Sequence, residues 1–334
     1  MTYSSGGLIE ATDYNGFVST SGNNINKIWS TGSTDFGYGQ TTIATVSAGG
    51  TVTATQWATL VNNLANIGSH TGTTLTSRTA PVAGNTISVL ANVATDINSV
   101  TGNRGNAVAS GTEYGVFTGT TSKTTATGSG TAAWTITFTH TLTFASADAA
   151  RYFFNAGGIV RLQYGKSSTG TDTDPDWNTF AGQCGVISFT GRVNSAAQTI
   201  AGVSYTGTTR TGGGGGTQTT LATTTGFYSL TNGAAATTIF QLNNATSPYS
   251  GEYIRTTVAL GSSSTVLTFV TTWVSDGSSG AGTSANISGG TAVSSPATSI
   301  GAATAPTTLL TYRPPSTTYL SAAWGTPTIA ASVA

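Results

Sequence analysis

The stretch TAAWTITFTHTLTF, residues 131–144, decides the fold class of this chain. Large side chains occupy every second position, and threonine fills almost every position between them. Successive side chains of a strand point to opposite faces, so this alternation is typical of a half-buried antiparallel strand. We expect the threonines to face solvent or a neighbouring subunit. The residues expected to face a core are Trp134, Ile136, Phe138, His140, Leu142 and Phe144.

Further strand-like segments follow, separated by turns rich in Gly, Ser and Thr. They are IVRLQYG, GVISFTG, GFYSL, TTIFQL, EYIRTTVAL and STVLTFVTTWV. Their number and spacing predict an antiparallel β-sandwich over residues 107–310. One or two short helices interrupt it, one capped by Ser146 and one beginning at Pro175. The glycine-rich segment 211–217 is expected to be a flexible loop or hinge.

Before residue 107 the hydrophobic period is that of a helix. The segment 50–68 is amphipathic, and we expect Thr55 to cap its helix and Gly68 to end it. The segment 7–25 repeats the spacing of glycine, threonine and large apolar residues found in the segment 50–68, with Thr12 in the position of the cap. A third helical pattern ends at Gly102. The sequence therefore predicts a fold that is mainly β, with a small helical module over residues 1–106 that contains an internal repeat.

The repeat carries large apolar residues at equivalent positions, and two interpretations of them remain open. The two copies either dock on a symmetric partner surface or pack against each other as a helical hairpin. Under the first interpretation the contact residues of the module are Tyr14, Phe17, Trp57 and Leu60.

The C-terminal segment 311–334 is marked by prolines, which favour an extended path. It contains Tyr319 and Trp324 but too few other apolar residues for a core of its own. We expect an extended C-terminal arm that lies on an adjacent subunit and buries these two aromatic side chains there.

Charge and cysteine content exclude several classes of protein. Charged residues make up 7% of the 334 residues, and the 11 basic and 11 acidic side chains cancel. A neutral chain without a basic cluster does not favour nucleic-acid binding. No apolar run is long enough to insert into a membrane, and the N-terminus lacks the features of a signal peptide. The single cysteine, Cys184, excludes an internal disulfide.

Candidate chemistry is sparse. Asp172, Asp174 and Asp176 have the alternate spacing of a calcium loop, but Trp177 stands where such a loop needs glycine and Gln183 where it needs glutamate. They are weak metal candidates, and a polar helix start explains them better. The histidines, His70 and His140, belong to no hydrolase motif, and we expect His140 to be a core residue with a hydrogen-bond partner. We expect neither an enzyme nor a cofactor.

A family resemblance is carried by several segments of the chain. YSSGGLIEATDYNGFV, GYGQ and TATQWATLVNNL, followed by ARYFFNAGGIVRLQYGK and DPDWNTFAG, resemble virion structural proteins of tailed bacteriophages, particularly those of marine cyanobacterial hosts. The resemblance covers residues 1–200 well and extends loosely through GFYSLTN and LTFVTTWVSD. It implies a particle component in the tail, baseplate, fibre or capsid decoration, and it supplies no catalytic residue.

These observations lead to three hypotheses of different classes. The first is a virion structural protein, assembled in the host cytoplasm, which contacts other virion proteins through its N-terminal module and forms a homo-oligomer. The expected oligomeric state is a trimer, by analogy to phage fibres. The second is a carbohydrate-binding or adhesin module that recognises a host-surface glycan. The third is a glycan depolymerase, for which no pair of carboxylates is marked in the sequence.

Overall fold

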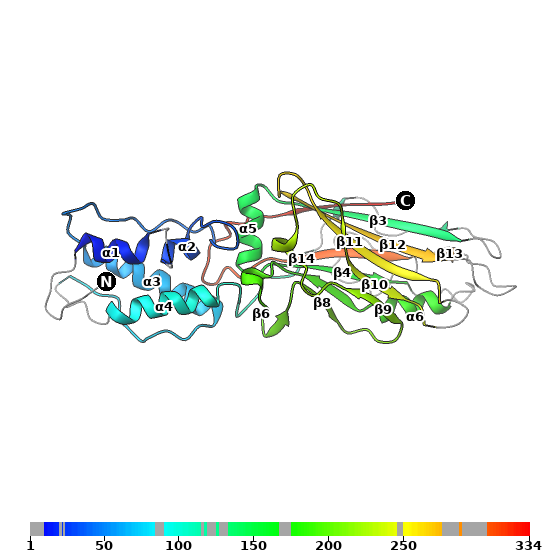
Figure 1. Cartoon of the computed structure of the whole chain (residues 1–334), viewed down its shortest axis with the longest axis horizontal. Coiled ribbons are helices and arrows are strands. Elements are labelled where there is room, and N and C mark those ends of the chain that lie inside the picture. Colours follow the sequence, from blue (N-terminus) through cyan, green and yellow to red (C-terminus); the bar gives the residue numbers. More distant parts are fainter. Residues whose placement is uncertain are drawn as a thin grey trace.

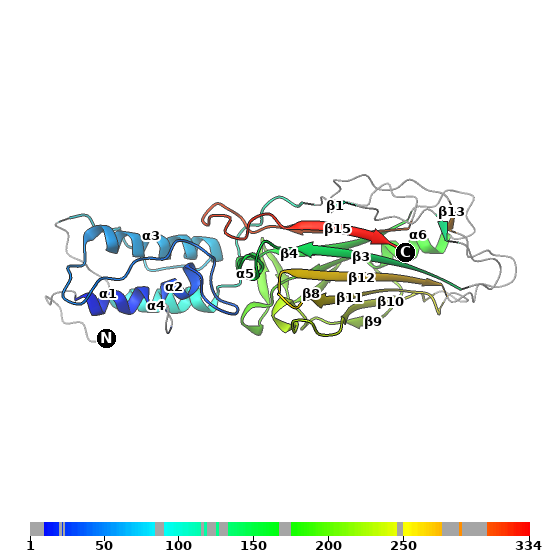
Figure 2. The same ribbon diagram turned by 90° about the horizontal axis from the view of Figure 1, so that it is seen from above.

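The computed structural model describes residues 10–19, 22, 24–83, 90–114, 117–118, 125–126, 133–166, 175–245, 250–275, 287–288 and 306–334. The molecule is elongated, with a helical module at one end and a β-sandwich at the other (Figures 1 and 2). The mainly β, antiparallel fold predicted from the alternating strands is confirmed.

The helical module contains α1 (Ala11–Val18), α2 (Ile25–Trp29), α3 (Ala54–Thr71) and α4 (Leu90–Gly102). Its helices begin slightly earlier than predicted. Thr53 caps α3, because its hydroxyl accepts from the Gln56 amide while the Gln56 side chain accepts from the Thr53 amide. The predicted caps Thr55 and Thr12 are therefore wrong, and Glu10 precedes α1. The helix α3 ends not at Gly68 but before Gly72, whose φ of 68° suits glycine.

The two copies of the repeat pack against each other. The rings of Tyr14 and Phe17 in α1 each lie 5.9 Å from the Trp57 ring in α3. Together with Leu60 they are buried inside the module. The prediction that these four side chains contact a partner is therefore wrong, because they close the core of the module together with buried apolar residues of α2 and α4.

The sandwich consists of two antiparallel sheets (Figure 1). In spatial order, the larger sheet contains β1 (Phe117–Thr118), β15 (Thr328–Val333), β3 (Trp134–Thr143), β12 (Val266–Ser275), β11 (Tyr253–Leu260), β10 (Thr237–Asn243) and β9 (Thr217–Leu221). The smaller sheet contains β14 (Thr307–Arg313), β4 (Ile159–Gly165), β5 (Val186–Phe189) and β8 (Thr208–Thr211). Among the strand pairs that the structure describes in these two sheets, β1 with β15 is parallel and the others are antiparallel.

Smaller elements complete the sandwich. They are the helices α5 (Ala147–Asn155) and α6 (Pro175–Gln183), the strand pairs β6 (Gln198–Ile200) with β7 (Val203–Tyr205) and β2 (Thr125–Ala126) with β13 (Ile287–Ser288), and the turns η1 (Val193–Ser195) and η2 (Phe227–Ser229). Ser146 caps α5 and α6 begins at Pro175, as predicted.

The inner faces of the two sheets meet in an aromatic core. The Tyr164 ring of β4 stacks on Phe240 of β10 with a centroid distance of 5.9 Å, and the Trp273 indole donates to the Thr308 hydroxyl across the sheets. The alternation in β3 is confirmed, because all its large side chains are buried and its threonines face outward. His140 is buried too, and the Thr308 backbone lies close enough to interact with its ring, but neither ring nitrogen makes a well-formed hydrogen bond.

The C-terminal segment is extended, as predicted, but it is not an arm on another subunit. β14 crosses the predicted boundary at residue 310 and pairs with β4, and β15 pairs with β3 over six residues, from Thr328 to Val333. Trp324, between these strands, is 2% exposed within its own chain. The predicted arm is wrong because the segment supplies a strand to each sheet, and the connection between these strands packs on its own chain, where the Ser321 amide and hydroxyl donate to the Gln40 side-chain oxygen.

The glycine-rich segment 211–217 carries the chain from β8 of the smaller sheet to β9 of the larger one. It packs closely on the end of α6, where the Gly214 amide donates to the Gln183 carbonyl. A Cβ atom on Gly213 would lie 2.3 Å from that same carbonyl oxygen, and its φ is 73°. Glycine is therefore required here for close backbone approach as well as for backbone conformation.

Candidate functional site

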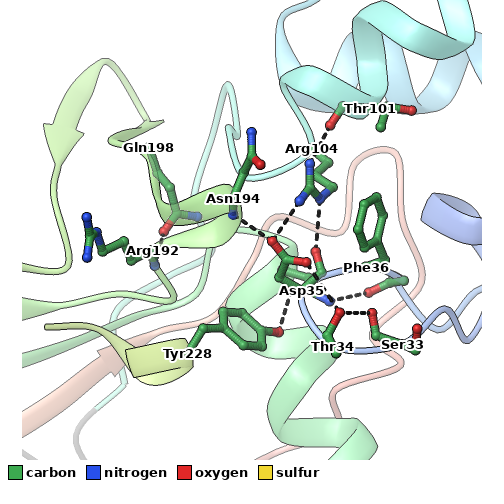
Figure 3. Close-up of polar contacts among 12 residues, drawn as sticks. Ser33, Thr34, Asp35, Phe36, Thr101, Arg104, Arg192, Asn194, Gln198 and Tyr228 are labelled. Carbon is green, nitrogen blue, oxygen red and sulfur yellow. Dashed lines mark hydrogen bonds and ion pairs between the residues drawn. The ribbon is translucent and has the colours of Figure 1, made fainter. Parts of the chain in front are cut away.

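A network of polar contacts lies at the junction between the helical module and the sandwich (Figure 3). A loop over residues 31–37, between α2 and α3, projects from the module toward α5 and η1. Three backbone hydrogen bonds close its base, from Tyr38 to Ile28, from Gly39 to Ser30 and from Gln40 to Trp29. The loop thereby presents Asp35 and Phe36 to the sandwich.

Asp35 joins the two regions directly. Its Oδ2 atom accepts from the Arg104 guanidinium at 2.6 Å and from the Asn194 backbone amide at 2.7 Å, and Asn194 belongs to η1 of the sandwich (Figure 3). Arg104 also donates to the carbonyl oxygens of Asp35 and Thr101. Arg104 is 5% exposed, so its charge is withdrawn from water and depends on these partners.

Phe36 adds a cation–π contact to this ion pair. The Arg104 guanidinium carbon lies 3.8 Å and the Lys27 Nζ atom 4.0 Å from the centre of the Phe36 ring. An aromatic ring attracts cations through its quadrupole, more strongly where water is excluded. Two basic side chains therefore converge on one ring beside a single carboxylate.

Helix α5 holds the same loop from the other side. Arg151 donates to the carbonyl oxygens of Thr31, Thr34 and Phe36, and the Asn155 side chain donates to the Gly37 carbonyl at 2.9 Å. These bonds satisfy loop carbonyl groups that no helix or strand would pair. The loop is thus fixed by both α5 and η1.

The η1 turn shows backbone strain at the point of contact. Arg192, Asn194 and Ser195 have φ values of 55°, 58° and 52°, in the left-handed region that non-glycine residues rarely adopt. The turn is held by Asp35 on the Asn194 amide and by the Gln198 side chain on the Arg192 amide. Such strain costs about 1 kcal/mol or more per residue and persists where surrounding bonds over-determine the conformation.

A second, more apolar contact lies behind this network. The Tyr38 hydroxyl donates to the Arg104 carbonyl at 2.6 Å, and its ring makes an edge contact with His70 at 5.5 Å. The His70 Nε2 atom donates to the Ala156 carbonyl at the end of α5. Burial lowers the pKa of His70 to about 4, and this hydrogen bond opposes only part of the shift. His70 is therefore neutral at pH 7.

The predicted site residues do not gather at this junction. Asp172 and Asp174 lie outside the described residues, and Asp176 lies in the first turn of α6. Among the residues that the structure describes, no group of three or more His, Cys, Asp or Glu side chains is arranged to hold a metal ion. Tyr319 is 40% exposed, and it alone among the six predicted contact residues keeps an accessible side chain.

The junction residues were not predicted from the sequence, although the scarcity of charged residues could have pointed to them. In a chain with 7% charged residues, each charged side chain is informative, because burial of a charge requires a partner. Asp35 and Arg104 are separated by 69 positions, so only the folded structure shows that they pair.

The thiol and the two imidazoles of the chain are withdrawn from solvent. Cys184 is buried, and burial raises the pKa of its thiol. His140 is also buried, and burial lowers its pKa to about 4. No helix among the described residues is long and apolar enough to cross a membrane. No protein-family model, curated protein or solved structure matches this chain.

Replacement of Asp35 by asparagine should test whether the junction stabilises the molecule. In Asp35→Asn the side-chain shape is kept, but the buried Arg104 loses its counter-charge, and we expect unfolding in urea to show a loss of about 2–4 kcal/mol. Asp148→Asn is the matched control, because Asp148 pairs with Arg151 while its side chain is 58% exposed. That variant should change stability by less than about 1 kcal/mol. Equal losses in the two variants would contradict a special role for the junction.

Proposed function

We propose that this chain is a structural component of a bacteriophage virion, of the tail, fibre, baseplate or capsid-decoration type. The observation that carries the proposal is the junction, which uses buried charge and a strained turn to fix a helical module against a β-sandwich. An elongated protein that is attached to a particle at one end needs a rigid connection of this kind, because its attached end then fixes the position of its outer end. In this proposal the helical module is the anchored end.

Three further observations support a structural role over an enzymatic one. The thiol and the imidazoles are buried, with pKa values shifted away from those of a working nucleophile or base. The carboxylates of Asp35, Asp96, Asp148 and Glu113 each pair with arginine. These four described carboxylates are therefore engaged in ion pairs and do not favour the depolymerase hypothesis. The resemblance of residues 1–200 to cyanophage virion proteins agrees with a structural role.

Purified particles provide the direct test of this function. We expect mass spectrometry of gradient-purified virions from the source phage to detect the chain in multiple copies per particle. Antibodies against the helical module should label intact particles less than antibodies against the sandwich, because the module is the anchored end. Absence of the chain from purified virions would overturn the proposal.

The proposal includes a homo-oligomer, with a trimer as the expected state. The outer face of the larger sheet is the surface that suits contact with a second copy. Its β3 threonines pair in register with outward-facing residues of β12, such as Thr139 with Val270. Among the outward-facing residues of β3, β12 and β11, which the structure describes in full, Arg255 alone is charged. A nearly uncharged face brings little repulsion between identical copies.

Introduction of a charge on this face should test the contact. Thr139→Lys places an ammonium group at the centre of the face without altering the core, and light scattering after size exclusion should show a shift toward monomer. Thr206→Lys is the control, because Thr206 is exposed in the turn between β7 and β8. We expect it to keep the oligomeric mass of the unaltered protein. A monomeric unaltered protein, or equal masses for all three proteins, would contradict this interface.

A further inference from the structure

A cavity of about 440 Å³ lies where the segment 314–326 passes residues 111–114, beside the end of β14. Its size falls within the range of about 300–1,000 Å³ that is typical of small-ligand sites. Its lining includes Thr112, Tyr114, Tyr312, Ser316, Trp324 and Gly325. The virion proposal assigns no role to this cavity.

Hydrogen bonds fix the walls of the cavity without any ligand. The backbones of Tyr114 and Tyr312 exchange two hydrogen bonds of 2.8 and 2.9 Å, and the Gly111 amide donates to the Pro314 carbonyl at 2.7 Å. The Tyr312 hydroxyl donates to the Pro327 carbonyl at 3.1 Å and so ties the end of the segment 314–326 to β14. A preformed site loses less conformational entropy on binding than one that must first be ordered.

The cavity presents one exposed aromatic ring on a buried aromatic base. Tyr114 is 42% exposed, whereas Tyr312 and Trp324 are each 2% exposed. The rings of Tyr114 and Tyr312 are 5.4 Å apart and inclined at 44°, so the inner ring supports the outer one. Tyrosine combines an apolar ring face with a polar tip, which suits ligands that are apolar on one side and hydrated on the other.

The polar groups of the described lining residues are hydroxyls and backbone groups, and none of these residues has a charged side chain. The nearest charged residues in the sequence are Glu113 and Arg313. The Glu113 carboxylate accepts hydrogen bonds from both Arg313 and Arg161. Since adjacent residues of an extended chain point to opposite sides, Glu113 and Arg313 face away from the side of Tyr114 and Tyr312. An ionic ligand would find no counter-charge in this cavity.

We infer that this cavity binds a neutral saccharide of one or two sugar units. The apolar face of a pyranose ring would stack on Tyr114, while hydroxyls such as those of Thr112 and Ser316 would bond to the sugar hydroxyls. An uncharged, hydroxyl-rich lining with one accessible aromatic ring matches a ligand that has both an apolar face and many neutral hydroxyls. This inference does not depend on the virion role, since a saccharide site serves an adhesin equally well.

Titration with defined sugars tests the inference. The probes are maltotriose, cellotriose, chitotriose and galactobiose, each followed by isothermal titration calorimetry and by ligand-observed saturation-transfer NMR. We expect at least one of them to bind saturably with a Kd of about 1 mM or tighter. Tyr114→Ala should weaken that binding about tenfold or more, because it removes the stacking surface. Tyr319→Ala, at an exposed tyrosine outside the cavity lining, should change the Kd by less than about twofold.

Two more variants separate loss of the site from loss of the fold. Tyr114→Phe keeps the ring and should bind within about threefold of the unaltered protein. Ala322→Arg places a long side chain at an exposed position of the rim and should block binding while leaving thermal unfolding unchanged. The absence of saturable binding for all four sugars at about 20 mM would overturn the inference. Binding of a proline-rich decapeptide that depends on Tyr114, without sugar binding, would overturn it as well.

Discussion

Deletion of residues 314–334 is expected to abolish cooperative folding of the sandwich. The deletion removes the whole of β15, which pairs with β3 over six residues, and leaves the central hydrophobic strand at a sheet edge. It also removes Leu320, Trp324 and Ile329, which are between 2% and 4% exposed. Each such side chain contributes about 1.5–3 kcal/mol when buried, so the sum is comparable to the total stability of a domain.

Circular dichroism during heating would measure this effect. We expect the truncated chain to show no cooperative transition, or one lowered by more than about 10 °C. Tyr319→Ala is the control within the same segment, because its exposed side chain contributes little to the core. A truncated chain that melted within a few degrees of the full chain would show that the segment is dispensable and that β15 does not stabilise the sandwich.

Acidification from pH 7.5 to pH 5 is expected to destabilise the protein by about 4 kcal/mol, through its two histidines. Burial lowers the pKa of both His70 and His140 to about 4, below the ordinary value of 6.5. Between these pH values the unfolded chain takes up protons that the folded chain does not bind. Stability is therefore complete above about pH 6.5 and falls as the pH decreases toward 4, by about 2 kcal/mol per histidine at pH 5.

The two histidines should respond differently to replacement. His140 has a weak contact with the Thr308 backbone but no well-formed hydrogen bond on either ring nitrogen, so His140→Leu should cost less than about 1 kcal/mol at pH 7.5. His70→Leu leaves the Ala156 carbonyl without its donor and should cost about 1–2 kcal/mol at that pH. Each variant should remove about half of the loss measured by urea unfolding between pH 7.5 and 5. If the double variant retained the full loss, other groups would be responsible for it.

The alternation around Phe138 was sufficient to predict the fold class. Strict alternation of large apolar residues with threonine is typical of a strand with one buried face. The observed burial along β3 follows this alternation without exception. Local signals also predicted the start of α5 at Ser146 and of α6 at Pro175, because caps depend on neighbouring residues alone. The helices of the module were therefore predictable from periodicity but not from their caps, whereas both signals located the helices of the sandwich.

The sequence by itself thus determined the strands β3, β4, β5, β10, β11 and β12 and which of their faces are apolar. The segment GFYSL was wrongly predicted as a strand, because it contains the short helical turn η2. Only the tertiary structure decided what those faces meet. Tyr14 and Trp57 pack on each other rather than on a partner, and Trp324 fills its own sandwich rather than a neighbouring one. Likewise Asp35 meets Arg104 and Asn194 from distant parts of the chain. The hydrophobic effect is non-directional, so an apolar stripe specifies burial without specifying its partner, and long-range pairing follows only from the assembled chain.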